Sequence, residues 1–174
     1  GFTCLAAAVL ATNATAQVTP SGKGFLLRAK YTRGAIAKYT LNTSMVVMGT
    51  KALVSTSIRE RVLSVSNGVG ELEIQMGKSK ATMGGDPIGK QMPMDNQKGT
   101  VKLDALGRNA DGTGFKVQTH VELPKAPVKI GDQWTTDTTA PVGKSRQKAR
   151  VTYKVVGFAT VSGKRVLKLA ETFS

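Results

Sequence analysis

The chain has 174 residues, and its 25 Lys and Arg residues outnumber its 11 Asp and Glu residues, which gives a net charge of +14. A chain of this length can bury a core as one domain, and a single cysteine excludes a disulfide framework within the chain. The positive charge favours anionic partners such as phospholipid headgroups, lipopolysaccharide, acidic wall polymers or nucleic acid, with general solubility as the plain alternative.

The first 16 residues are typical of a secretory signal that is truncated at its start. Leu5–Ala11 is an apolar run, and Ala14-Thr15-Ala16 supplies the small residues that a signal peptidase recognises. We therefore expect a signal helix over residues 1–16, cleaved before Gln17, and a bacterial protein that is periplasmic or secreted. Cys4 precedes the apolar run, so we do not expect it to carry a lipid anchor.

The remaining residues, 17–174, are expected to form one β-rich domain, and its strand-like end suggests that further sequence continues it. Apolar and polar residues alternate with a period of two, which is typical of half-buried strands. This pattern predicts strands near residues 25–32, 37–47, 52–66, 71–76, 101–105, 115–123, 134–139, 147–158 and 164–173. Asn67-Gly68 predicts a tight hairpin turn. The predicted fold class is all-β and mainly antiparallel: a strongly curved sheet, an open barrel or a sandwich.

Residues 77–99 are rich in Gly, Lys, Met and Pro, and we interpret them as a loop or mobile flap. Met83, Met92 and Met94 are the residues of this flap that we expect to contact a ligand. Thioethers also suit Cu(I), but no His or Cys lies nearby, and methionine commonly fills apolar surfaces. The segment 84–90 has the spacing of a phosphate-binding loop, but Gln91 stands where Ser or Thr is needed and Pro93 stops a helix.

Residues 123–134 predict a structural corner between two halves of the domain. Pro124 and Pro127 fix the backbone and remove hydrogen-bond donors, so the preceding strand must end there. Gly131 and Asp132 form a turn signal, and Trp134 is expected to bury its ring and anchor that turn.

At this corner the chain resembles an uncharacterised family of bacterial exported proteins and lipoproteins with the motif Leu-Pro-x-x-Pro-Val-Lys-x-Gly-Asp-x-Trp. A strand with Tyr39, Leu41 and Met45, followed by a Gly- and Met-rich middle, is similar to that family in outline. Many members of the family carry a lipid anchor, and this sequence departs from them because no cysteine follows its apolar run. The resemblance implies no catalytic residues. The layout is also similar, as architecture only, to the curved sheets of periplasmic lipoprotein carriers.

The sequence does not predict an enzyme, a cofactor or a metal site. His120 is the only histidine and is expected on the outward face of its strand. No Gly-x-Ser-x-Gly elbow and no zinc-type cluster occurs, and Glu71 and Glu73 fit a hydrated sheet surface. Asp104, Asn109 and Asp111 could offer oxygens to Ca²⁺, but these residue types form turns first.

The most informative charges are Lys144, Arg146, Lys148 and Arg150, which alternate along a predicted strand and so point to one face. We call these four residues the basic row and expect them to contact an anion. Like charges in a row need compensation by solvent, by acidic residues of a neighbouring strand or by an anionic partner. Nucleic acid is not expected, because aromatic residues make up only 5% of the chain.

These observations lead to a functional hypothesis: a non-enzymatic envelope or secreted binding protein. A lipid-like or hydrophobic ligand would lie on a concave sheet, and a basic face would approach anionic surfaces, with peripheral membrane contact. The alternatives are a structural or assembly protein that docks on an anionic envelope polymer and, third, a copper-binding protein.

Overall fold

The computed structural model describes residues 5–6, 15–47, 49–89, 95–112, 120–142, 145–161 and 163–173. These residues confirm the predicted fold class: they form antiparallel sheets without a helix, and one sheet is strongly curled into a half-barrel. Most of the expected signal segment lies outside the described residues. Its described parts are in strands, because β1 (Leu5–Ala6) pairs with β11 and because β2 (Thr15–Ser21) begins at Thr15.

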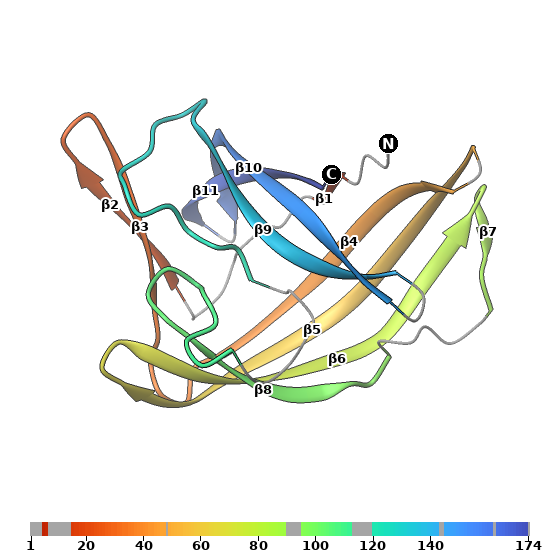
Figure 1. Cartoon of the computed structure of the whole chain (residues 1–174), viewed down its shortest axis with the longest axis horizontal. Coiled ribbons are helices and arrows are strands. Elements are labelled where there is room, and N and C mark those ends of the chain that lie inside the picture. Colours follow the sequence, from red (N-terminus) through yellow and green to blue (C-terminus); the bar gives the residue numbers. More distant parts are fainter. Residues whose placement is uncertain are drawn as a thin grey trace.

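The curled sheet contains the longest strands and has the order β4-β5-β6-β7, with β8 also paired to β6. Its strands are β4 (Ile36–Val47), β5 (Thr50–Ser66), β6 (Val69–Met83), β7 (Asp86–Pro87) and β8 (Lys98–Leu103). Figure 1 shows β4, β5 and β6 running side by side along a curved path.

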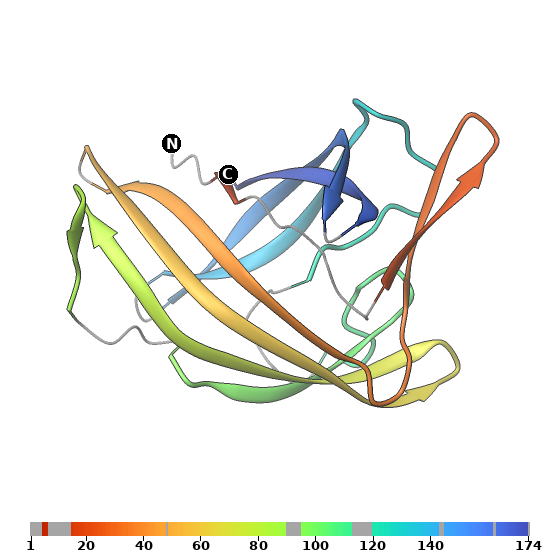
Figure 2. The ribbon, with the colours of Figure 1, turned by 180° about the vertical axis from the view of Figure 1, so that it is seen from behind.

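A second sheet has the order β1-β11-β10-β9, with β9 (Gln133–Val142), β10 (Ser145–Val161) and β11 (Lys164–Phe173). Both views of the chain place this sheet across the hollow side of the curled sheet (Figures 1 and 2). The hairpin of β2 and β3 (Gly24–Lys30) projects at one end. The inner side of the curled sheet therefore faces the rest of the protein, and its outer side faces solvent.

The inner side of the curled sheet is a hydrophobic core made by alternate residues of its strands. The buried members are Ile58, Val62, Leu72, Ile74, Met76, Val101 and Leu103. A second cluster joins the hairpin and the second sheet through Leu27, Leu123, Val128, Val155 and Leu169. Ile74 is 0% exposed and Met76 is 1% exposed, so the chain's own side chains fill the middle of the concave face. A hydrophobic ligand would have to lie nearer an end of the sheet.

The hairpin that joins β5 to β6 turns at Asn67 and Gly68, as the sequence predicts. Both residues have positive φ angles of 49° and 76°, the conformation that a two-residue hairpin of this kind requires. Gly70, just after the turn, lies under the ring of Tyr31, and a Cβ at this position would overlap that ring. A glycine therefore allows the aromatic residue to pack flat against β6.

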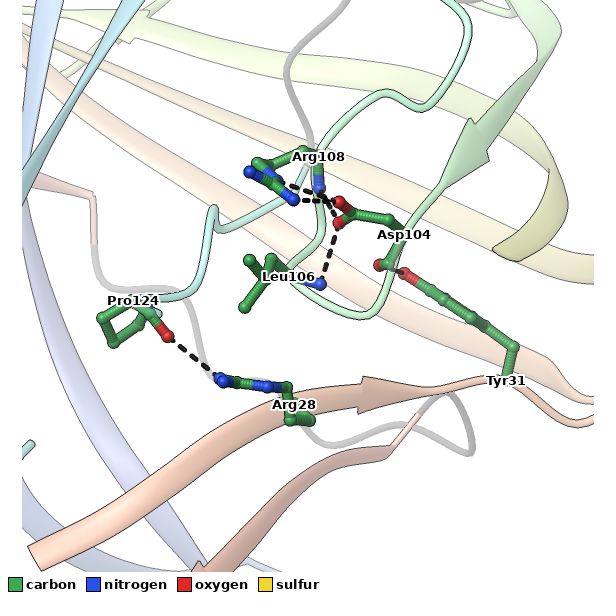
Figure 3. A network of polar contacts seen from close by, with 6 residues as sticks. All are labelled: Arg28, Tyr31, Asp104, Leu106, Arg108 and Pro124. Atoms are coloured by element: carbon green, nitrogen blue, oxygen red, sulfur yellow. Dashed lines mark hydrogen bonds and ion pairs between the residues drawn. The ribbon is translucent and has the colours of Figure 1, made fainter. Parts of the chain in front are cut away.

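A polar network ties the hairpin of β2 and β3 to the following loops (Figure 3). The Arg28 guanidinium donates hydrogen bonds to the carbonyl oxygens of Pro124 (3.0 Å) and Lys125 (2.8 Å), and the Tyr31 hydroxyl donates to the carbonyl of Asp104 (3.1 Å). The Asp104 carboxylate accepts the Leu106 amide and the Arg108 amide and guanidinium. These bonds outweigh partial burial and lower the pKa of Asp104.

Two sequence predictions are wrong in part. Residues 77–99 are not one loop, because β6 continues to Met83 and is followed by the short β7, with β8 starting at Lys98. A bulge at Gly77 interrupts the alternation of β6, so its continuation to Met83 was not recognisable from the pattern that precedes it. The strand predicted over residues 115–123 is also not formed where it is described, since residues 120–124 are irregular.

Candidate anion-binding face

The outer side of the curled sheet carries most of the exposed cations that the structure describes on its strands. Successive side chains of a strand point to opposite faces. The residues that alternate with the buried ones therefore lie on this outer side. The cations at these outward positions are Lys38 on β4, Lys51, Arg59 and Arg61 on β5, Lys78 and Lys80 on β6, and Lys98 and Lys102 on β8. All are exposed except Arg59, which is half-buried.

At the end of this side near the β5–β6 turn, the charges are balanced. Glu73 forms a 2.9 Å ion pair with Lys98 and lies opposite Arg61 in the register, and the hydrogen bond from Lys98 lowers the pKa of Glu73. Glu71 accepts a hydrogen bond from Ser64 and lies opposite Lys102. These carboxylates belong to a surface charge network, which agrees with a hydrated sheet.

Away from that end, the charged outward positions that the structure describes are cationic, and their cations form no ion pair. Here Lys38, Lys51, Arg59, Lys78 and Lys80 occupy the outward positions, and we call them the cationic face. The outward positions of β4 and β5 hold no Asp or Glu. Within the described residues none of the five cations forms an ion pair with a carboxylate. Uncompensated like charges on adjacent strands repel one another, so an anionic partner would stabilise this face.

The basic row lies on β10, but only one of its side chains is described. Lys144 is outside the described residues, and the side chains of Arg146 and Lys148 are not described, although their backbones pair with Pro141 and Thr139 of β9. Arg150 is exposed and forms a 3.1 Å ion pair with Asp137 of β9. At this position an acidic residue of the neighbouring strand supplies the compensation.

Sequence reasoning missed the cationic face for a structural reason. The register between β5 and β6 shifts twice: β6 carries an extra residue between Met76 and Ser79, and β5 carries one between Val62 and Ser64, so alternation is interrupted on each strand once. Lys78 and Lys80 were assigned to a loop. The available signal was two pairs of cations, each two residues apart: Arg59 with Arg61, and Lys78 with Lys80. Only the pairing of β5 with β6 brings the two pairs onto one face.

A polar cluster on the inner side involves Tyr39, Glu60 and His120. The prediction that His120 points outward is wrong: its side chain is 18% exposed, and its Nδ1 lies 3.6 Å from Oε1 of Glu60. Its Nε2 is buried without a hydrogen-bond partner among the described residues. The outward prediction failed because residues 120–124 do not form the strand on which it depended.

Burial controls the ionisation of this cluster. The Glu60 side chain is 7% exposed and accepts a hydrogen bond from the Tyr39 hydroxyl. Burial raises the pKa of Glu60 to about 7, although the bond from Tyr39 acts in the opposite direction. Burial also lowers the pKa of His120 to about 4. Near pH 5.5 the folded pair therefore holds one proton on Glu60 and none on His120. The cluster belongs to the inner side of the sheet, away from the cationic face.

The corner residues lie around the start of β9. Gly131 has a φ of 95° and its amide donates to the Val155 carbonyl, while the Asp132 carboxylate accepts the Lys129 amide at 2.8 Å. Pro124 accepts the bond from Arg28, and Pro127 is exposed. Trp134 packs on the second core cluster, stacks on Tyr153 with ring centroids 5.3 Å apart, and donates from Nε1 to the Glu122 carbonyl at 2.7 Å.

The predicted flap residues are not brought together by the described structure. Met83 ends β6 and is 40% exposed, whereas Met92 and Met94 lie outside the described residues. Across the ranges that are described, no three His, Cys, Asp or Glu side chains are grouped as metal ligands would be. Asn109 accepts the amides of Asp111 and Gly112, and Asp111 pairs with Lys102, so these oxygens have turn and ion-pair roles.

Comparisons with known proteins give no relative from which a function could be inferred. No protein-family description, no curated protein and no solved structure matches it. In the described part of the chain, no helix is both long enough and apolar enough to cross a membrane.

Proposed function

We propose that the protein is an exported, non-enzymatic binding protein that attaches to an anionic polymer of the bacterial envelope through its cationic face. The observation that carries this proposal is that no described carboxylate lies opposite Lys38, Lys51, Arg59, Lys78 or Lys80, on the solvent side of the longest strands. The apolar run and small residues before Gln17 support export.

The curvature of the sheet favours a polymer over a flat bilayer. The cationic face is the outer side of a curled sheet, so a planar membrane would touch it along a strip only. A flexible polyanion can follow a convex surface and reach cations on β4, β5 and β6 together. Each cation that it neutralises releases counterions, which makes the binding depend strongly on salt.

The test compares two variants that remove the same number of charges. One replaces Lys51, Arg59, Lys78 and Lys80 by Gln, and the other replaces the basic row, Lys144, Arg146, Lys148 and Arg150. Binding to polyphosphate is measured by titration calorimetry at several salt concentrations, with dextran as the neutral polymer. We expect the first variant to lose more affinity and more salt dependence. Equal losses would mean that only net charge matters, and would reject this face as the binding site.

A second candidate function is the binding of a hydrophobic ligand on the concave side, at the end of the curled sheet away from the β5–β6 turn. There Met83 is 40% exposed, and Leu41 and Val54 are half-buried on the inner side. A lipid-like ligand could pack on these residues without displacing the core around Ile74. Native mass spectrometry of protein purified gently from its source tests this candidate. A co-purifying mass of lipid size would support it, and a bare protein would argue against it.

A further inference from the structure

The cationic face contains a hollow in the middle of the curled sheet. This pocket has a volume of about 440 Å³, within the range of small-molecule sites, and opens to solvent. The polar residues that line it are Lys38, Tyr39 and Thr40 of β4, Ser57 and Arg59 of β5, Gln75 of β6, and Asn96. Among the described residues that line it there is no Asp or Glu.

The hollow has a local cause in the pairing of β5 with β6. Between the pairs Ile58–Met76 and Thr56–Ser79, β6 carries one more residue than β5, which is a β-bulge. Gly77 lies at this bulge, and a Cβ there would overlap the Ser57 hydroxyl. Small side chains therefore form the floor where larger ones would fill the space.

Neighbouring backbone and side-chain groups hold the bulge in place. The Ser79 amide donates to the Asp95 carboxylate at 2.8 Å, and the Met76 amide donates to the Gln97 carbonyl at 2.8 Å. The segment before β8 is thereby fixed beside the pocket and presents Asn96 at its rim. The Asp95 carboxylate is committed to the bulge and does not line the pocket.

The two cations of the pocket, Lys38 and Arg59, lie opposite each other on the adjacent strands β4 and β5. Lys38 and Arg59 are direct partners in the β4–β5 register, where side chains lie close together and like charges destabilise the pairing. Arg59 acts electrostatically on Glu73, but Glu73 is already paired with Lys98. Around these cations, Thr40, Ser57, Gln75 and Asn96 offer neutral hydrogen-bond donors.

We infer that this pocket binds a tetrahedral oxyanion, a phosphate or phosphoester group, between Lys38 and Arg59. Arg presents a planar fork that suits two phosphate oxygens, and Lys adds a second charge. The hydroxyl and amide groups supply donors for the remaining oxygens. Because the pocket is open, the phosphate can belong either to a free small molecule or to a polymer chain. The inference deepens the proposed function, since the pocket lies within the cationic face.

The experiment titrates inorganic phosphate into the whole protein at constant ionic strength and compares it with polyphosphate. In Lys38→Gln/Arg59→Gln we expect phosphate binding to weaken about tenfold or more, since each lost charged hydrogen bond is worth about one such factor. The matched control, Lys23→Gln/Lys154→Gln, removes the same charge at two exposed positions outside the cationic face and should keep the parent affinity for phosphate. Equal losses in both variants, or no saturable phosphate binding by the parent protein, would overturn the inference.

The two ligands separate this inference from the proposed function. If phosphate binds in the pocket but polyphosphate binding is not sensitive to the cationic face, the pocket is a small-molecule site and the polymer proposal fails. If polyphosphate binds through the face while phosphate does not saturate, the pocket inference fails alone. A third measurement needs no ligand: without phosphate, Lys38→Gln should raise the unfolding temperature because it removes repulsion with Arg59. A lowered temperature would show that the two cations are compensated, and would count against the site.

Discussion

Oε1 of Glu60 and Nδ1 of His120 lie 3.6 Å apart on the inner side of the curled sheet, and burial shifts the pKa values of the two side chains in opposite directions. In the unfolded chain near pH 5.5, the histidine is protonated and the glutamate is ionised. In the folded protein the proton is on the glutamate. Both states therefore hold one proton on this pair, and folding moves the proton without changing its number.

The pair should contribute little to the pH dependence of stability between about pH 4.5 and 6.5. Glu60 alone has a raised pKa, so its contribution is full below 4.5 and is lost as the pH rises through about 7. His120 alone has a lowered pKa, so its contribution is full above 6.5 and is lost as the pH falls through about 4. The two slopes have opposite signs and cancel.

Single substitutions should reveal the two slopes. Relative to the parent protein, Glu60→Gln should gain stability as the pH rises from 4.5 to 7, and His120→Gln should lose it over the same range, each by on the order of 2 kcal/mol. Urea unfolding at several pH values measures both. Glu171, whose pKa burial raises to about 7, is present in all three proteins and cancels in the comparison. Parallel slopes in the two variants would show that the proton does not move between these residues.

Gly77 should be intolerant of a side chain, although Gly has no positive φ here. A Cβ would overlap the Ser57 hydroxyl at the bulge, so Gly77→Ala should lower the free energy of unfolding by about 1–3 kcal/mol. Gly89 is the matched control, because a Cβ there has open space, and Gly89→Ala should change stability little. Adding Ser57→Ala to Gly77→Ala should recover part of the loss. Additive effects of these two substitutions would mean that the overlap is not the cause.

The Arg28 side chain should be sensitive even to replacement by lysine. Its guanidinium reaches the carbonyls of Leu27, Pro124 and Lys125, which one ammonium group cannot bond with the same geometry. Arg28→Lys should therefore cost about 1–2 kcal/mol of stability in chemical denaturation. Arg33→Lys, at an exposed turn, serves as the control and should be neutral. If the two replacements behave alike, the link between the hairpin and the corner contributes nothing to folding.

The sequence predicted the strands where alternation is regular and failed where the backbone departs from it. Lys38 to Val47 alternate as one half-buried strand, and Asn67-Gly68 has the residues that its turn requires. Gly77–Met83 was assigned to a loop because a bulge interrupts the alternation just there. Lys38 and Arg59 are brought together by the register between β4 and β5, which the composition of the chain does not encode. The pocket could therefore be recognised only after the strands were paired.

Trp134 joins the corner to the second sheet together with the backbone bonds of Gly131 and Asp132 to Val155, and its indole N–H can be tested separately from its ring. Trp134→Phe keeps an aromatic ring against Tyr153 but removes the 2.7 Å hydrogen bond to the Glu122 carbonyl. The orphaned carbonyl is in a half-buried segment, so we expect a loss of about 1–2 kcal/mol. Trp134→Leu removes the stacking as well and should cost more. Denaturation followed by far-ultraviolet circular dichroism measures both variants without depending on the tryptophan signal. Equal costs for Phe and Leu would assign the anchoring to the hydrogen bond, and a neutral Phe variant would assign it to packing on Tyr153.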